Sequence, residues 1–139
     1  MLAAYAERTQ VPVTRSKAEL EALLVRAGAT RVATMIQTEC AALAFSMGGR
    51  NYRFMLPLTE EPKRGRGRDP AQVARQRWRA LTLTVKAKLE AARSGITSLE
   101  TEFLPYAVLP GGRTVADAVL PGIARAYSTG RDVPLLPEA

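Results

Sequence analysis

The stretch that decides the fold spans residues 31–58 and reads RVATMIQTECAALAFSMGGRNYRFMLPL. Thr38-Glu39 and Gly48-Gly49 divide it into three runs rich in apolar and β-branched residues, a pattern typical of strands joined as hairpins. The Gly-Gly pair suits a two-residue turn between antiparallel strands, because such turns need positive φ. The stretch therefore predicts three antiparallel strands, at 31–37, 40–47 and 51–58.

Two-residue turns at both breaks would also fix the register of these strands. Nine residues then fall on one face, and eight of them are apolar, in the rows Val32–Phe45–Tyr52, Thr34–Leu43–Phe54 and Ile36–Ala41–Leu56. The opposite face is mixed, with small residues in the middle strand, and carries Arg31, Ala33, Met35, Ala42, Ala44, Ser46, Asn51, Arg53 and Met55. We expect the first face to form the core. The second would be exposed to solvent, lightly covered, or used for binding.

Helices are predicted before and after this stretch in the sequence. Ser16-Lys17-Ala18-Glu19 has capping-box spacing, which predicts a first helix at 17–27 that stops at Gly28. Asp69 and Pro70 favour a helix start and predict a long helix at 70–94. Its expected core face consists of Ala71, Ala74, Trp78, Leu81, Val85, Leu89, Ala92 and Ile96.

The C-terminal third predicts two further helices. The pattern Thr97-Ser98-Leu99-Glu100 predicts a short helix ending near Pro105, followed by an extended segment at 106–109. Thr114 then caps a last helix, which Pro121 should kink or interrupt and Gly130 should end. That helix would use Val115, Val119, Ile123, Ala126 and Tyr127. We thus predict an α+β fold in the order α-β-β-β-α-α-α, in which a long central helix packs on a three-stranded antiparallel meander.

Length and composition are those of one globular domain. The 139 residues are 47% hydrophobic and 24% charged, and they show no internal repeat. A flexible basic loop is expected at 59–69 and a proline-containing tail at 131–139. No apolar run approaches the length of a membrane span, and the N-terminus has no signal-peptide pattern, so we expect a cytoplasmic location without membrane contact.

Positive charge is concentrated in residues 63–93. This segment contains ten basic and two acidic residues, so its net charge is +8. The whole chain has a net charge of +7, and the remaining residues therefore sum to −1. Arginine alternating with glycine at 64–68 presents guanidinium groups on a pliable backbone that can follow phosphates. The predicted nucleic-acid contacts are Lys63, Arg64, Arg66, Arg68, Arg75 and Arg79. A solvated helix face and loop would show the same pattern.

The sequence contains no recognisable catalytic apparatus. Without histidine and with Cys40 as its only cysteine, the chain cannot form an internal disulfide, a zinc site of the usual type or a histidine-based acid–base pair. A metal-dependent nuclease needs a cluster of acidic ligands, and the predicted strands contain none. We expect no enzyme activity and no cofactor.

Three motifs resemble a family of small bacteriophage- and prophage-encoded proteins to which no activity is attached. They are YAERT before VPV at 5–13, RWRAL continuing to SGI at 77–96, and LPGGRTV at 109–115. The resemblance implies an accessory protein acting in a bacterial host cell, of the kind that handles nucleic acid or blocks a host defence system. It implies no site residues.

These observations lead to one main functional prediction and two alternatives. The first is a non-enzymatic accessory protein that binds DNA or RNA through the basic loop and helix flank. The second is an inhibitor that binds an acidic host protein, such as an anti-CRISPR, through the open sheet face or the apolar back of the long helix. That back consists of Ala80, Leu83, Ala87 and Ala91, and it could also form a homodimer. The third is capture of an anionic nucleotide between Arg31 and Arg53.

Overall fold

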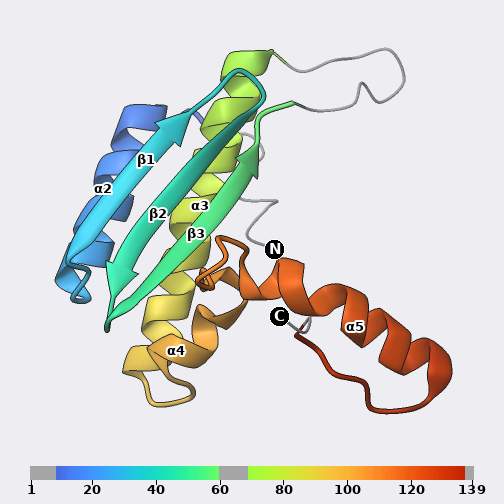
Figure 1. Cartoon of the computed structure of the whole chain (residues 1–139). Helices are drawn as coiled ribbons and strands as arrows, with labels where there is room; N and C mark the ends of the chain where they lie inside the picture. Colours follow the sequence, from blue (N-terminus) through green and yellow to red (C-terminus); the bar gives the residue numbers. More distant parts are fainter. Residues whose placement is uncertain (1–8, 60–68, 137–139) are drawn as a thin grey trace.

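The computed structural model describes residues 9–59 and 69–136 (Figure 1). The order of elements is the predicted one, with a 3-10 turn added before the last helix. The elements are α2 (Val13–Arg26), β1 (Arg31–Ile36), β2 (Cys40–Met47), β3 (Arg50–Pro57), α3 (Pro70–Arg93), α4 (Leu99–Glu102), η1 (Leu104–Tyr106) and α5 (Val115–Thr129). None of these helices is both long enough and apolar enough to cross a bilayer.

The sheet is the predicted meander, with strand order β1-β2-β3 and both pairs antiparallel. All three predicted rows are present, since Val32 pairs with Phe45 and Phe45 with Tyr52, and the other two rows follow in step. Gly48 and Gly49 have φ of 60° and 76°, the positive values that a two-residue turn of this type requires. The turn chemistry therefore sets the register.

Helices α2 and α3 lie side by side behind one face of the sheet, forming a two-layer body (Figure 1). The predicted inward face supplies most of the core from the sheet: Ala41, Leu43, Phe45, Tyr52, Phe54 and Leu56 are buried. No described helix covers the opposite face, where Met35 is 61% exposed and Met55 55%. This second face is therefore open to solvent in the part of the chain that the structure describes.

The start of α2 differs from the prediction. The helix begins at Val13, after Pro12 in extended conformation, and no side chain caps it. Ser16 is thus inside the helix and fully buried, where its carbonyl accepts a 3.1 Å hydrogen bond from the Thr82 hydroxyl of α3. The predicted capping box was wrong because Pro12 starts the helix one turn earlier, and the small side chain at Ser16 lets the two helices approach closely.

Helix α3 begins and ends as predicted, with the Asp69 carboxylate accepting from the backbone N–H of Ala71. Its core face is only partly as predicted. Trp78, Leu81 and Val85 are buried, and Val73, Gln76 and Thr82 join them. Ala71 and Ile96, however, are exposed. The buried arc shifts because α3 packs on α2 as well as on the sheet, whereas the predicted stripe assumed one neighbour.

Residues 97–114 connect α3 to the last helix along the β3 edge. Ser98 caps α4, which is shorter than predicted because the chain turns into η1 after Phe103. Phe103 is fully buried, with its ring centroid 5.4 Å from that of Phe45 and 5.8 Å from that of Tyr52. These ring contacts fix the connector on the body.

Helix α5 leaves the body and projects into solvent (Figure 1). It is capped by Thr114 and ends at Gly130 with φ 69°, as predicted, and it continues through Pro121 without interruption. After Gly130 the chain turns back along the helix. This return brings the backbone of residues 134–135 against Gly122, which is buried. We refer to residues 115–136 as the C-terminal arm.

Candidate functional site

The predicted nucleic-acid contacts divide into two groups. Lys63, Arg64, Arg66 and Arg68 lie outside the described residues. Arg75 and Arg79 lie on α3, where each contacts another side chain: Arg75 donates to Gln72 Oε1 over 2.6 and 3.1 Å, and Arg79 pairs with Glu19 Oε2 of α2 at 2.6 Å. Both arginines on α3 therefore already have a side-chain partner within the described residues.

The Arg79–Glu19 pair ties α3 to α2. The two side chains are 24% and 35% exposed, so the pair is shielded from water more than a typical surface ion pair. A phosphate that engaged Arg79 would have to share or displace the Glu19 carboxylate. Nucleic-acid binding through these residues stays a prediction.

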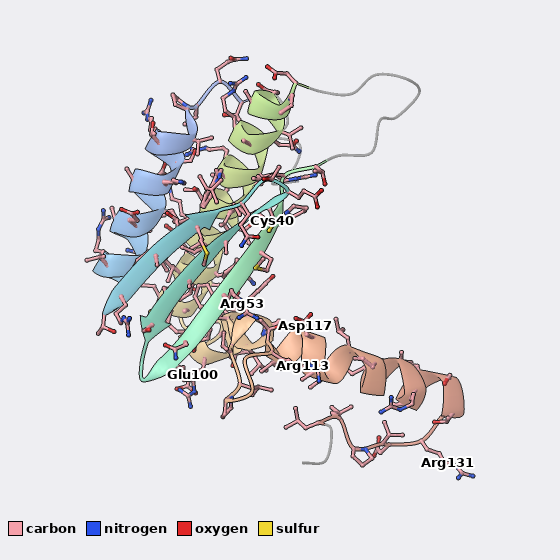
Figure 2. All side chains as sticks on the ribbon, turned by 45° about the horizontal axis from the view of Figure 1, so that its top comes forward. Cys40, Arg53, Glu100, Arg113, Asp117 and Arg131 are labelled. Carbon is pink, nitrogen blue, oxygen red and sulfur yellow. The ribbon has the colours of Figure 1, made fainter. Side chains whose placement is uncertain are left out.

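Arg31 and Arg53, the predicted nucleotide ligands, stand on the open face of the sheet but not in the same row. Arg31 pairs with Ser46, and Arg53 with Ala44. Arg53 Nη2 donates to the Gly112 carbonyl over 2.9 Å, which fastens the turn before α5 to the sheet (Figure 2). Arg53 is therefore engaged with the turn before α5.

No catalytic constellation emerges among residues 9–59 and 69–136. They hold no group of three or more His, Cys, Asp or Glu side chains that could bind a metal ion. The Cys40 thiol donates weakly to Gln37 Oε1 at 3.5 Å. Burial raises the pKa of Tyr52 above its usual 10.0, the nearby Arg50 lowers it and Glu100 raises it, so this phenol stays protonated at neutral pH.

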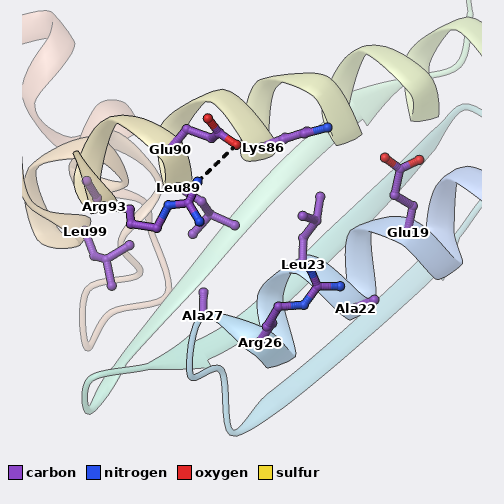
Figure 3. A pocket seen from close by; sticks show the side chains of 11 residues that line it. Glu19, Ala22, Leu23, Arg26, Ala27, Lys86, Leu89, Glu90, Arg93 and Leu99 are labelled. Atoms are coloured by element: carbon purple, nitrogen blue, oxygen red, sulfur yellow. Dashed lines mark ion pairs between the residues drawn. The ribbon is translucent and has the colours of Figure 1, made fainter.

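A groove of about 660 Å³ lies between the C-terminal halves of α2 and α3 (Figure 3). Its apolar lining includes Leu23, Leu89 and Leu99. The charged residues around it are Glu19, Arg26, Lys86, Glu90 and Arg93, three cations and two carboxylates. Because Glu19 and Glu90 are paired with Arg79 and Arg93, the groove has a net positive rim that would favour an acidic, partly apolar ligand.

The predicted dimer face on the back of α3 is only partly open. Ala80, Leu83 and Ala91 are half-buried and Ala87 is exposed. Dimerisation through this face stays a prediction.

The C-terminal arm carries exposed apolar side chains on a helix that projects from the body. Leu120, Ala124 and Tyr127 share the face of α5 opposite Gly122, and Tyr127 is 88% exposed. Leu135 and Leu136 of the returning segment are exposed as well. Tyr127, which was grouped with Val115, Val119, Ile123 and Ala126 on one helix face, thus lies on the exposed side of α5. The spacing of Leu120, Ala124 and Tyr127 was the available signal for a second apolar face.

A specific contact holds the base of this arm. Pro121 has no N–H to donate to the carbonyl of Asp117, four residues earlier in the helix. Arg113 Nη2 donates to that carbonyl over 2.7 Å instead, and these two residues adjoin each other in Figure 2. The carbonyl of Asp117 therefore keeps a hydrogen-bond donor although Pro121 cannot supply one.

The fold and these surfaces define a two-layer α+β protein with a projecting helical arm. No protein-family model matches the chain, and no curated protein or solved structure is detectably similar to it.

Proposed function

We propose that this protein is a non-enzymatic accessory protein that binds another protein through its C-terminal arm. The observation that carries the proposal is the exposed stripe of Leu120, Ala124 and Tyr127 on a helix that stands away from the body. Apolar side chains spaced i, i+4 and i+7 on one helix face are the usual anchors of a helix that docks in a groove of its partner.

The construction of the arm supports this proposal. The Arg53 bond to Gly112 ties the turn before α5 to the sheet, the Arg113 bond to Asp117 supports the first turns of the helix, and Gly122 packs against the returning segment. A rigid helix loses little conformational entropy on binding, which favours affinity. Tyr127 offers a large apolar ring with a polar tip, a combination enriched at the centre of protein interfaces.

Nucleic-acid binding is the second candidate, favoured by the +8 charge of residues 63–93. It requires the basic loop to supply most of the contacts, because Arg75 and Arg79 already contact Gln72 and Glu19. Binding of this kind would weaken steeply as salt rises, because phosphate contacts release counterions.

Affinity capture from nuclease-treated bacterial lysate tests the two candidates. The wild-type protein is compared with an arm variant, Leu120→Lys with Tyr127→Lys, and with a matched control outside both the arm and β1, Met55→Lys with Ile96→Lys. All four positions are exposed, so both variants should keep the wild-type circular dichroism spectrum and melting temperature.

A stoichiometric protein captured by wild type and control, but not by the arm variant, is the expected result. Equal capture by the arm variant would contradict the proposal. DNA or RNA that is captured from a parallel lysate without nuclease treatment and released by moderate salt, with no stoichiometric protein from the treated lysate, would support the second candidate instead.

A further inference from the structure

Strand β1 is an edge strand without the usual protection. The strand reads RVATMI, contains no proline or lysine, and has its only charge at Arg31, the first position. Ile36 and Met35 near its end are 59% and 61% exposed. Within the described residues no other strand pairs with its outer side. Natural proteins usually blunt such edges, because an open strand is a template for pairing with another chain.

The hydrogen-bond pattern shows which backbone groups are open. Gln37 N–H donates to the Cys40 carbonyl, and the register places Met35 opposite Ala42 and Ala33 opposite Ala44. Antiparallel pairs alternate, so residues 33, 35 and 37 bond to β2 while those between them point outward. The N–H and C=O groups of Val32, Thr34 and Ile36 therefore face away from β2.

The opposite edge of the sheet, along β3, is covered by another part of the chain. Val108 N–H donates to the Asn51 carbonyl over 2.8 Å, and Ala107 forms a bridge with Tyr52. Pro57 stands at the end of that strand. The N-terminal segment, by contrast, gives no cover to β1 where it is described, since the Thr9 carbonyl accepts from Gln72 on α3.

We propose that β1 pairs with β1 of a second copy of this chain, forming a continuous six-stranded antiparallel sheet about a two-fold axis. The strand specifies one register. With the axis at Thr34, Val32 lies opposite Ile36 of the second copy, and Thr34 opposite itself. Val32, Thr34 and Ile36 of each copy then all belong to hydrogen-bonded pairs, which gives about six N–H···O bonds. With the axis at Ala33, Ile36 would have no partner residue in the other strand. With the axis at Met35, Val32 would have none.

The side chains agree with this register. On the core side Val32 meets Ile36 and Thr34 meets Thr34, which are β-branched pairs that stabilise antiparallel strands. On the open side Ala33 meets Met35, so the exposed Met35 gains an apolar neighbour on the second copy. Arg31 lies opposite Gln37 rather than Arg31 of the second copy, so no like charges face each other.

Light scattering and cross-linking test the dimer on the nuclease-treated full chain. Wild type should give a dimer mass that dissociates on dilution. Ile36→Lys places a charge opposite Val32 and should give a monomer, whereas Met55→Lys adds the same charge to an exposed residue of β3 and should stay dimeric. Circular dichroism checks that both are folded.

A cysteine pair then tests the register. In a Cys40→Ser background, oxidised Thr34→Cys should form a disulfide dimer, because paired Cα atoms are about 5.5 Å apart. Ala33→Cys should not, because in this register it is about 8 Å from its own copy. A wild-type monomer at every accessible concentration, a dimer that survives Ile36→Lys, or equal cross-linking at 33 and 34 would each overturn the proposal.

Discussion

Replacing Arg113 with alanine is expected to loosen the first turns of α5 without disturbing the sheet. The guanidinium donates over 2.7 Å to the Asp117 carbonyl, which Pro121 leaves without its helical partner. Bonds from charged donors contribute about 1.5–3 kcal/mol when shielded, but this one is exposed and competes with water. We therefore expect a loss of about 1 kcal/mol, roughly a fivefold shift in the local opening equilibrium.

Amide hydrogen exchange is the appropriate assay, because it resolves opening of α5 from unfolding of the body. In Arg113→Ala, exchange in residues 115–122 should speed up about fivefold, with the strands β1–β3 unchanged. Arg113→Lys retains the positive charge and an N–H donor group, so its exchange rates should lie between those of the wild type and Arg113→Ala.

A double-mutant cycle isolates the cause. Pro121→Ala restores an N–H that can donate to the Asp117 carbonyl, so in that background Arg113→Ala should cost less than about 0.3 kcal/mol. Equal costs in both backgrounds would refute the assignment of Arg113 as the substitute donor. They would leave the arginine with only a general electrostatic effect.

Further predictions concern the core and the arm. Trp78→Ala should lower the free energy of unfolding by about 3–5 kcal/mol in urea denaturation, because the indole is 1% exposed. Ser16→Ala should leave the melting temperature unchanged or raise it, since the buried hydroxyl has no hydrogen-bond partner in the described structure. Burial raises the pKa of Tyr52, so folding favours its neutral form; stability should fall as pH rises from about 10 through the folded pKa, and Tyr52→Phe should remove that loss in alkaline denaturation. Gly122→Val should expose residues 131–136 to proteolysis while Ala124→Val does not, because a Cβ at Gly122 would lie 3.3 Å from the backbone it packs on.

The sheet could be predicted from the sequence almost completely, because its information is local. Two-residue turns fix which residues face each other, and one face then contains eight apolar residues among nine. A shift of one residue would have turned that set to solvent. Only the strand ends and the fate of Ile36, which is exposed at the edge, needed the structure.

Helix faces were less predictable, because periodicity identifies an apolar stripe but not its neighbours. On α3 the neighbouring α2 draws Thr82 into the buried arc, where its hydroxyl donates to the Ser16 carbonyl, and Ile96 falls beyond the end of the helix. On α5 the buried face packs on the returning segment through Gly122, which leaves Tyr127 outside.

The candidate site shows the same limit for charges. The run of basic residues was evident in the sequence, yet Arg79 is paired with Glu19, sixty residues away. Charge density along the chain does not reveal such partners, since they meet only when the two helices pack. The same holds for Arg53, whose bond to Gly112 spans 59 positions and fixes the arm rather than a ligand.

The two surfaces proposed for binding, strand β1 and the C-terminal arm, lie at opposite edges of the sheet. Strand β1 forms one edge, whereas the connector and the arm follow the β3 side (Figure 1). Pairing through β1 therefore leaves both arms at the outer ends of the six-stranded sheet, free to engage partners. A dimer of this kind presents two anchors at a fixed separation, and a target with two matching sites would be held about 10²–10⁴-fold more tightly than by one arm. Ile36→Lys would abolish that gain while leaving the affinity of a single arm unchanged, whereas changes at Leu120 and Tyr127 would remove binding and leave the dimer intact.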